Sequence, residues 1–149
     1  MLRAPFALKL LLLSWLLLSG AWVRQAAADA LPDAAGRQAI QAVIGRQIEA
    51  FRHDNAEGAF SYASPNIQQM FGSADNFMRM VRQGYQPVYR PGQVHFGVLD
   101  LEEGRLTQRV ILQGPDGLPV TALYFMQQMP DGSWRIDGCI LLPVEDRST

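Results

Sequence analysis

The chain has 149 residues, with 13 basic and 14 acidic side chains, a formal net charge of −1 and a single cysteine. This length suits one ordinary domain once a targeting segment is set aside. Because the basic residues form no cluster, the composition argues against a nucleic-acid partner and against electrostatic attachment to an anionic membrane. The single cysteine, Cys139, cannot form an internal disulfide bond, and its apolar neighbours favour a buried, inert thiol over an intermolecular one.

The first 28 residues have the pattern of a secretory signal peptide. Arg3 and Lys9 precede an apolar run over residues 10–18, and the small residues 26–28 suit a signal peptidase. Polar and small residues interrupt and follow the run, which favours a cleaved leader over a membrane-spanning anchor. We therefore expect cleavage after Ala28, export to the periplasm or the cell exterior, and no stable membrane anchor after cleavage.

Residues 29–149 then form the mature domain, and its first part has the pattern of capped, amphipathic helices. Asp33 is predicted to cap a long helix whose apolar side consists of Ile40, Val43, Ile44, Ile48 and Phe51. Asp54, with Glu57 three residues later, resembles a capping box for a short helix through residues 56–60.

Two further helices and a proline-rich connection come next. Ser64 is predicted to cap the first helix and Gly72 to end it in the left-handed conformation, while Ser73 and Gly84 bracket the second. We expect these two helices to form a lid over a sheet. Residues 85–91 are predicted to lead to the sheet as an edge strand, which the prolines would protect from further pairing.

After this connection the hydrophobic period falls from 3.6 to 2, which is typical of strands. Turn signals rich in proline, aspartate and glycine separate four predicted strands, at residues 93–101, 105–113, 118–128 and 133–142. Three tight reversals imply an antiparallel meander. Alternation in the last strand places Ile136 and Ile140 together on the apolar face that the helices cover. The predicted fold class is α+β, with N-terminal helices packed on a curved antiparallel β-meander and a frayed tail from about residue 144.

Several motifs occur in a fixed order along the chain: Ile44 to Phe51, Tyr62 to Pro65, Met70 to Ser73, Gly84 to Pro91 and Asp131 to Cys139. In this order they resemble a bacterial family known as domain of unknown function 4864. That family is similar in organisation to the nuclear transport factor 2-like superfamily, whose α+β cone wraps a curved sheet around helices. The resemblance implies this fold and an internal apolar pocket, and it implies no particular reaction.

His95 and Asp100 are the polar residues of an otherwise apolar strand. One number is odd and the other even, so they point to opposite faces unless a bulge intervenes. His95 is a weak candidate for a catalytic base, and Tyr62 or Tyr89 are the candidate donors beside it. The candidate ligand-binding residues are Tyr62, Tyr85, Tyr89, His95 and Trp134, whose rings could line a pocket.

The other chemically suggestive residues have simpler interpretations. His53 lies at a helix end with no second histidine nearby, so no metal site and no cofactor are expected. Arg90 could hold an anionic ligand, but pairing with an acidic side chain across the sheet is the favoured interpretation.

These patterns favour an exported binding or interaction module with a small apolar ligand or a protein partner. The alternative is a small general acid–base enzyme, isomerase-like or hydrolase-like, that uses the pocket. A homodimer joined through the outer face of the sheet is a third hypothesis. Whether His95 and the tyrosines meet in one cavity discriminates the enzyme from the binding module.

Overall fold

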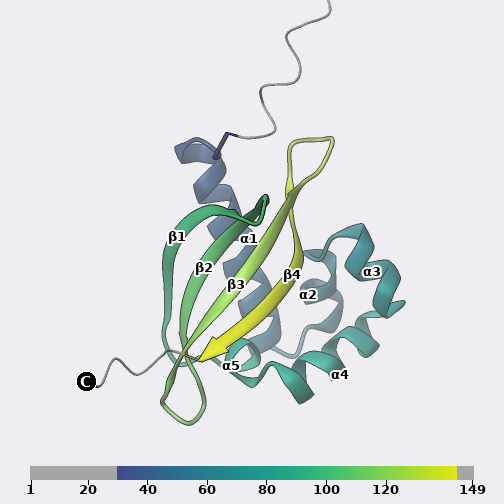
Figure 1. Ribbon diagram of the computed structural model, residues 1–149. Helices are drawn as coiled ribbons and strands as arrows, with labels where there is room; N and C mark the ends of the chain where they lie inside the picture. The colour runs from purple at the N-terminus through teal and green to yellow at the C-terminus, as the bar shows by residue number, and fades with distance from the viewer. Residues whose placement is uncertain (1–29, 144–149) are drawn as a thin grey trace, which may run out of the picture. The chain divides into compact units, whose positions relative to one another are not determined.

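The computed structural model describes residues 30–143, so the predicted signal peptide and the predicted frayed tail lie outside the described residues. From Leu31 onward the chain forms one unit, in which five helices precede four strands (Figure 1). Within this described part, no helix has the length and apolar character needed to cross a membrane. The order of elements confirms the predicted α+β class; the finer likeness to a nuclear transport factor 2-like cone stays a prediction.

The helices begin and end largely where the capping residues predict. Their bounds are α1 Ala34–Arg52, α2 Ala56–Ser61, α3 Pro65–Phe71, α4 Ala74–Gly84 and α5 Gln86–Tyr89. Asp33 caps α1 by accepting a hydrogen bond of 2.8 Å from the backbone N–H of Gly36. Ser64 and Ser73 cap α3 and α4 in the same way, and Gly72 ends α3 with a φ of 71°.

The predicted cap of α2 is wrong by one residue. Asn55, not Asp54, accepts the hydrogen bond from the N–H of Gly58, at 2.9 Å. Asp54 instead adopts a left-handed φ of 54° where the chain leaves α1. The side chain of Asp54 is engaged by arginine and tyrosine side chains from α4 and the α5 region.

The predicted edge strand at residues 85–91 is also wrong, because Gln86–Tyr89 forms the short helix α5. Pro87 lies in the first turn of this helix, where a missing N–H breaks no helical hydrogen bond. The N–H of Tyr89 donates to the carbonyl of Tyr85 at 2.9 Å and closes the turn.

The four strands form one antiparallel sheet in the order β1-β2-β3-β4, as the tight turns predict. Their bounds are β1 Val94–Glu102, β2 Arg105–Gln113, β3 Pro119–Gln128 and β4 Trp134–Pro143. Gly117 and Gly132 have φ values of 79° and 86° and donate their N–H groups to the carbonyls of Gly114 and Met129. These are the left-handed positions that the two turn sequences require.

A bulge in β4 changes which residues face the helices. Phe125 pairs with Gly138 and Met126 with Ile136, so Asp137 between them has no partner in β3. The extra residue inverts the alternation beyond it. The expectation that Ile136 and Ile140 share the covered face is therefore wrong: Ile136 is buried, whereas Ile140 is 46% exposed and Cys139 takes the inward position.

A second bulge lies in β1, between Phe96 and Leu99. His95 and Asp100 were expected to point to opposite faces of the sheet unless a bulge lay between them, and this is such a bulge. Their partners are Ile111 and Thr107, two odd-numbered residues of β2, so the bulge places both side chains on one face of the sheet.

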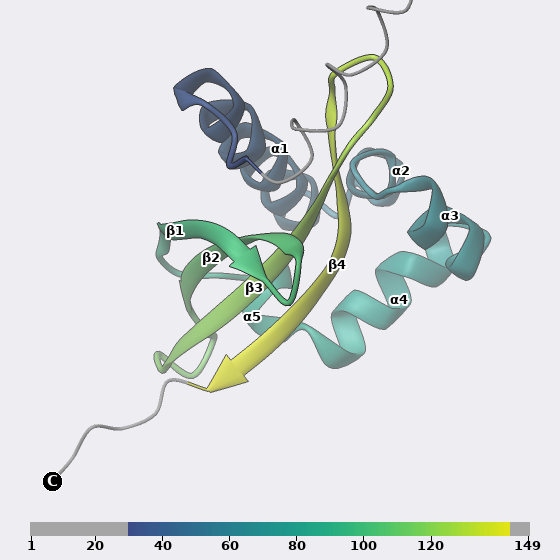
Figure 2. The same ribbon diagram turned by 45° about the horizontal axis from the view of Figure 1, so that its top comes forward.

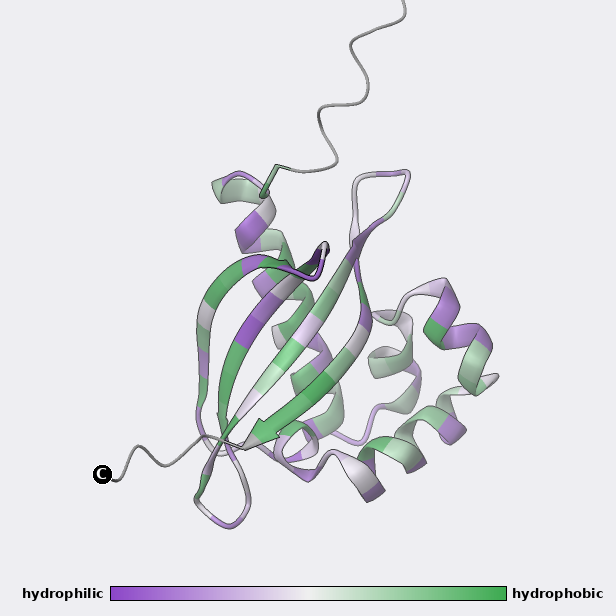
Figure 3. Ribbon diagram, viewed as in Figure 1, coloured by the Kyte–Doolittle hydropathy of each residue, from purple (hydrophilic) through white to green (hydrophobic). Residues whose placement is uncertain are grey.

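The core lies between the sheet and the helices. α1 crosses the inner face of the sheet, and α2, α3 and α4 lie beside β4 (Figures 1 and 2). The segment before α3 also pairs with this edge, because the N–H of Ser64 donates to the carbonyl of Ile136 at 2.8 Å. Hydrophobic segments alternate with polar ones along the strands (Figure 3), and the buried residues of α1 include Ile40, Ile44 and Ile48. The largest fully buried core side chains include Ile40, Ile44, Ile48, Phe51, Met78, Val110, Leu112 and Tyr124.

Candidate functional site

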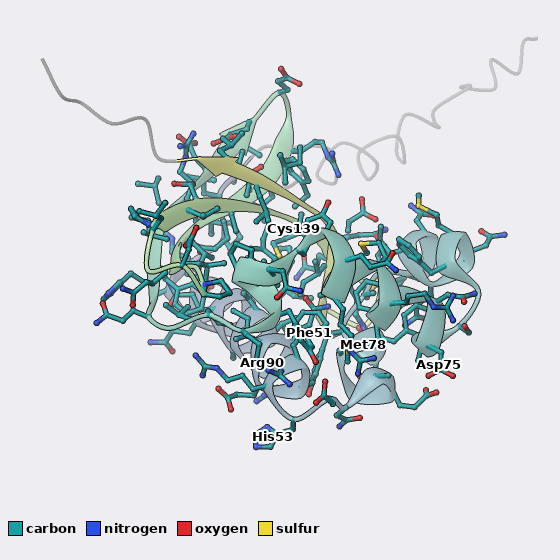
Figure 4. The ribbon with its side chains drawn as sticks, turned by 90° about the horizontal axis from the view of Figure 1, so that it is seen from below. Phe51, His53, Asp75, Met78, Arg90 and Cys139 are labelled. Atoms are coloured by element: carbon teal, nitrogen blue, oxygen red, sulfur yellow. The ribbon has the colours of Figure 1, made fainter. Side chains whose placement is uncertain are left out.

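A cavity of about 370 Å³ lies between the helices and the inner face of β3 and β4. Its wall is formed by Gln47, Phe51, Ala63, Ile67, Met70, Phe71, Phe77, Met80, Val81, Tyr85, Val88, Tyr124, Ile136, Gly138 and Cys139. None of these side chains is charged at neutral pH. Figure 4 labels Phe51 and Cys139, two residues of this wall, in the interior of the molecule and His53 at its periphery.

Gln47 is the most polar residue of the wall and is only 3% exposed. Its Nε2 donates to the carbonyl of Ala59 at 3.1 Å, which joins α1 to α2 and fixes the orientation of the amide. The Oε1 atom accepts no hydrogen bond from any of the described residues. Since an amide oxygen accepts hydrogen bonds strongly, the cavity wall offers an acceptor at this point.

Tyr124 is the second polar residue of interest, because it is fully buried in the wall. Among residues 30–143 no group lies within hydrogen-bond distance of its hydroxyl oxygen. Desolvation by burial, with a smaller contribution from the neighbouring Cys139, raises the pKa of Tyr124 well above 10.0. The hydroxyl is therefore protonated at neutral pH and is an unused donor.

Cys139 and Tyr85 complete the polar part of the wall. The Tyr85 hydroxyl donates to the backbone carbonyl of Cys139 at 3.1 Å, so this donor is already used. Burial raises the pKa of the Cys139 thiol to about 12. Because the thiolate is the nucleophilic form, this pKa keeps the half-buried Cys139 thiol protonated at neutral pH and so lowers its reactivity.

The helix α3 forms the part of the wall nearest to the surface. None of its residues is fully buried, and Met70, which lines the cavity, is 74% exposed. The cavity therefore reaches the surface beside α3. The two helices after Ser64 thus line the cavity together with β3 and β4, and their role as a lid over the sheet stays a prediction.

The structure places only one of the five predicted ligand-binding residues, Tyr85, in the cavity wall. Tyr62 and Trp134 are half-buried elsewhere, and Tyr89 lies in a surface cluster. His95 is exposed, with its Nε2 atom 3.4 Å from Oε1 of Gln93. Since His95 and the tyrosines do not meet in the cavity, the geometry gives no support to an acid–base enzyme built on them.

The surface cluster joins the end of α1 to α4 and α5. The Asp54 carboxylate accepts hydrogen bonds from the Tyr89 hydroxyl, from Arg82 at 3.1 Å and from Arg90 at 2.9 Å. Arg90 also lies over the Tyr89 ring, 4.0 Å from its centroid. Arg90 is thus paired with an acidic side chain, as the sequence analysis favours. The partner, Asp54, lies just after α1 and not across the sheet. Figure 4 shows Arg90 and His53 near this helix end.

Asp54→Asn is expected to lower stability at pH 7, with a loss that shrinks in acid. The hydrogen bonds from Tyr89 and then Arg82 lower the pKa of Asp54 from 3.8 to about 2. A lowered folded-state pKa stabilises the fold above the unfolded value, and this contribution disappears as the pH falls from about 4 towards 2. Urea midpoints from pH 7 to pH 2 measure the difference. Glu103→Gln, at an exposed residue with no ion pair among the described residues, is the control. A constant difference at every pH would contradict the prediction.

The outer face of the sheet carries an apolar patch that none of the described helices covers. Leu123 is 7% exposed there, and its neighbours Ile111, Ile140 and Leu142 are 40–46% exposed. We call these four residues the outer patch. The charged side chains beside it are paired within the chain, Arg109 with Glu102 and Arg105 with Asp137.

Two polar residues of the cavity, Gln47 and Tyr124, were missed as site candidates. For Gln47 a signal exists, because it falls on the apolar stripe of α1 between Ile44 and Ile48. A polar residue on such a stripe must find a partner inside the fold. For Tyr124 the signal is weaker, because a tyrosine in a two-sided apolar strand is also typical of an ordinary core.

Comparison with known proteins places the chain in a family. No curated protein matches the chain by sequence. Within residues 30–143, no three histidine, cysteine, aspartate or glutamate side chains gather as metal ligands would. The profile of one domain family matches residues 33–149, which is nearly all of the chain after the predicted leader. The chain therefore belongs to the family described as "Domain of unknown function (DUF4864)", as its motifs predict.

Proposed function

We propose that this protein is an exported module that binds a small, largely apolar molecule in the cavity beside α3. The observation that carries the proposal is the cavity itself: about 370 Å³, with a wall dominated by phenylalanine, methionine, valine and isoleucine. This volume lies within the range of about 300–1,000 Å³ that is typical of small-molecule sites. Burial of apolar ligand surface is the driving force that such a wall provides.

The composition of the wall also supports adaptable binding. Met70 and Met80 lie on the lid helices, and methionine side chains adjust readily to ligands of different shape. No residue of the wall is charged, so binding depends little on salt. A site of this kind suits a binding module better than a catalyst.

Met80→Trp is expected to abolish binding of the neutral fluorophore N-phenyl-1-naphthylamine, because the larger ring fills the cavity that the wild-type protein offers. Wild-type protein should bind the fluorophore saturably with one site, measured by fluorescence titration. Leu118→Trp adds the same ring at a turn residue that is 62% exposed and outside the cavity wall, so it should leave the titration unchanged. Equal binding by wild type and Met80→Trp would overturn the proposal.

The outer patch favours a second candidate property, pairing with a second copy of the chain. A two-fold interface brings the same patch of both copies together. Because Arg105 and Arg109 are neutralised by acids of their own chain, two copies would meet there without charge repulsion.

Native mass spectrometry of protein purified after expression of the complete gene tests the pairing and the export together. We expect the mass of a dimer whose subunits lack residues 1–28. Ile140→Asp, which puts a carboxylate in the outer patch, should give monomers, whereas Val98→Asp, at an exposed residue of the β1 bulge, should not. A wild-type monomer would exclude the pairing, and a full-length subunit mass would exclude cleavage of the leader.

A further inference from the structure

We infer that the ligand of the cavity is uncharged and carries a hydroxyl group, which hydrogen-bonds to Tyr124 and Gln47. This inference rests on the proposed function of the same site and names the chemical class of its ligand. Its starting point is that the apolar wall contains two buried residues with spare hydrogen-bonding capacity: the Tyr124 hydroxyl has no partner among the described residues, and the Gln47 side chain makes one hydrogen bond there, through Nε2.

The first of these groups is a donor. The Tyr124 hydroxyl lies in a fully buried side chain of β3, on the inner face that forms the cavity wall. A buried hydroxyl without a partner costs about 1–3 kcal/mol relative to a bonded one. A ligand oxygen beside Tyr124 would recover that free energy. Because protein atoms cover the Tyr124 hydroxyl, a hydrogen bond to a ligand there requires a small shift of the Tyr124 ring.

The second group is an acceptor that α1 contributes to the same cavity wall. Gln47 is only 3% exposed, and its Nε2 donates a hydrogen bond to the carbonyl of Ala59 at 3.1 Å. This bond directs Oε1 away from Ala59, and Oε1 has only acceptor capacity. A ligand must therefore supply a hydrogen to Gln47 and an oxygen lone pair to Tyr124. A hydroxyl group provides both, whereas an ether or a ketone provides only the lone pair.

The wall also selects against charge on the ligand. It contains no lysine, arginine or histidine to pair with a carboxylate, and no acid to pair with an amine. Burial of an unpaired ionised group is far more costly than burial of a neutral polar group. An alcohol with an apolar body fits this wall better than the fatty acid or the amine of the same length.

The experiment compares ligands of one length by displacement of N-phenyl-1-naphthylamine at pH 8: 1-decanol, decyl methyl ether and decanoate. We expect 1-decanol to bind about three- to tenfold more tightly than the ether, which is the usual net effect of one hydrogen bond, here the one donated to Gln47. Decanoate, ionised at this pH, should bind more weakly than both.

Tyr124→Phe removes the proposed donor without removing any bond of the empty protein, so its fold and its fluorophore binding should persist. In this variant 1-decanol and the ether, which both accept from Tyr124, should each bind about three- to tenfold more weakly, while the preference for decanol, which depends on Gln47, should stay. Tyr85→Phe is the matched control, because that hydroxyl lines the same cavity but already donates to Cys139, and the affinities of both ligands should stay unchanged.

The outcomes separate the two proposals. If the fluorophore binds and Met80→Trp abolishes binding, but decanol and its ether bind equally, the hydroxyl inference is wrong while the binding module stands. Tighter binding of decanoate would also overturn the inference. If neither the fluorophore nor decanol binds to the wild-type protein, both proposals fail.

Discussion

Phe51→Ala is expected to lower the free energy of unfolding by about 3–5 kcal/mol, the usual loss for a phenylalanine removed from a core. Phe51 is 1% exposed and lies in the last turn of α1. Its ring centroid is 6.1 Å from that of Phe77, so it joins α1 to α4. Chemical denaturation with urea, followed by circular dichroism, measures the loss.

Phe71→Ala is the matched control for this prediction. The Phe71 ring also contacts Phe77, at 5.5 Å between centroids, but Phe71 is only half-buried and lies on the lid helix α3. Its removal should therefore cost about 1–2 kcal/mol, which combines partial burial with one aromatic contact. If both variants lost the same free energy, the assignment of Phe51 to the central core would be wrong.

Gln108→Leu is expected to destabilise the fold by about 1–3 kcal/mol, although leucine is apolar and similar in size. The fully buried Nε2 of Gln108 donates to the carbonyls of Gly97 and Arg109, each at 2.9 Å. The bulge in β1 disrupts the regular ladder at Gly97, so the variant leaves a carbonyl there without this donor. The unpartnered Oε1 of Gln108 disappears as well, which offsets part of the loss.

The control for Gln108 is a glutamine of the same strand. Gln113→Leu changes an exposed side chain at the end of β2, so a change within about 0.5 kcal/mol is expected. Urea denaturation compares the two variants. A Gln108→Leu protein as stable as wild type would show that the bulge does not depend on the side-chain amide.

The local elements were predictable because their signals lie within a few residues of one another. Ser64 with Pro65 starts α3 and Gly72 ends it, since the cap, the proline and the left-handed glycine each act on the adjacent turn. The hairpin turns are equally local, and Gly117 and Gly132 take the backbone conformation that only glycine adopts easily.

The features that shape the site depend on pairing between distant segments. Without knowledge of the bulge at Asp137, strict alternation turns Ile140 inward and Cys139 outward, which is the reverse of the structure. Similarly, Pro87 suits an edge strand and a helical first turn equally well, and tertiary contacts decide for the helix. A bulge adds one residue without any required composition, so the sequence pattern alone does not reveal it.

The inward position of Cys139 has a practical consequence for kinetic measurements. It is the only cysteine of the chain, and its thiol lies in the cavity wall with a pKa raised to about 12 by burial. Cys139 is half-buried in this wall, so a ligand in the cavity would cover its thiol further. The rate at which a thiol reagent labels the unmodified protein should therefore fall when the cavity is occupied.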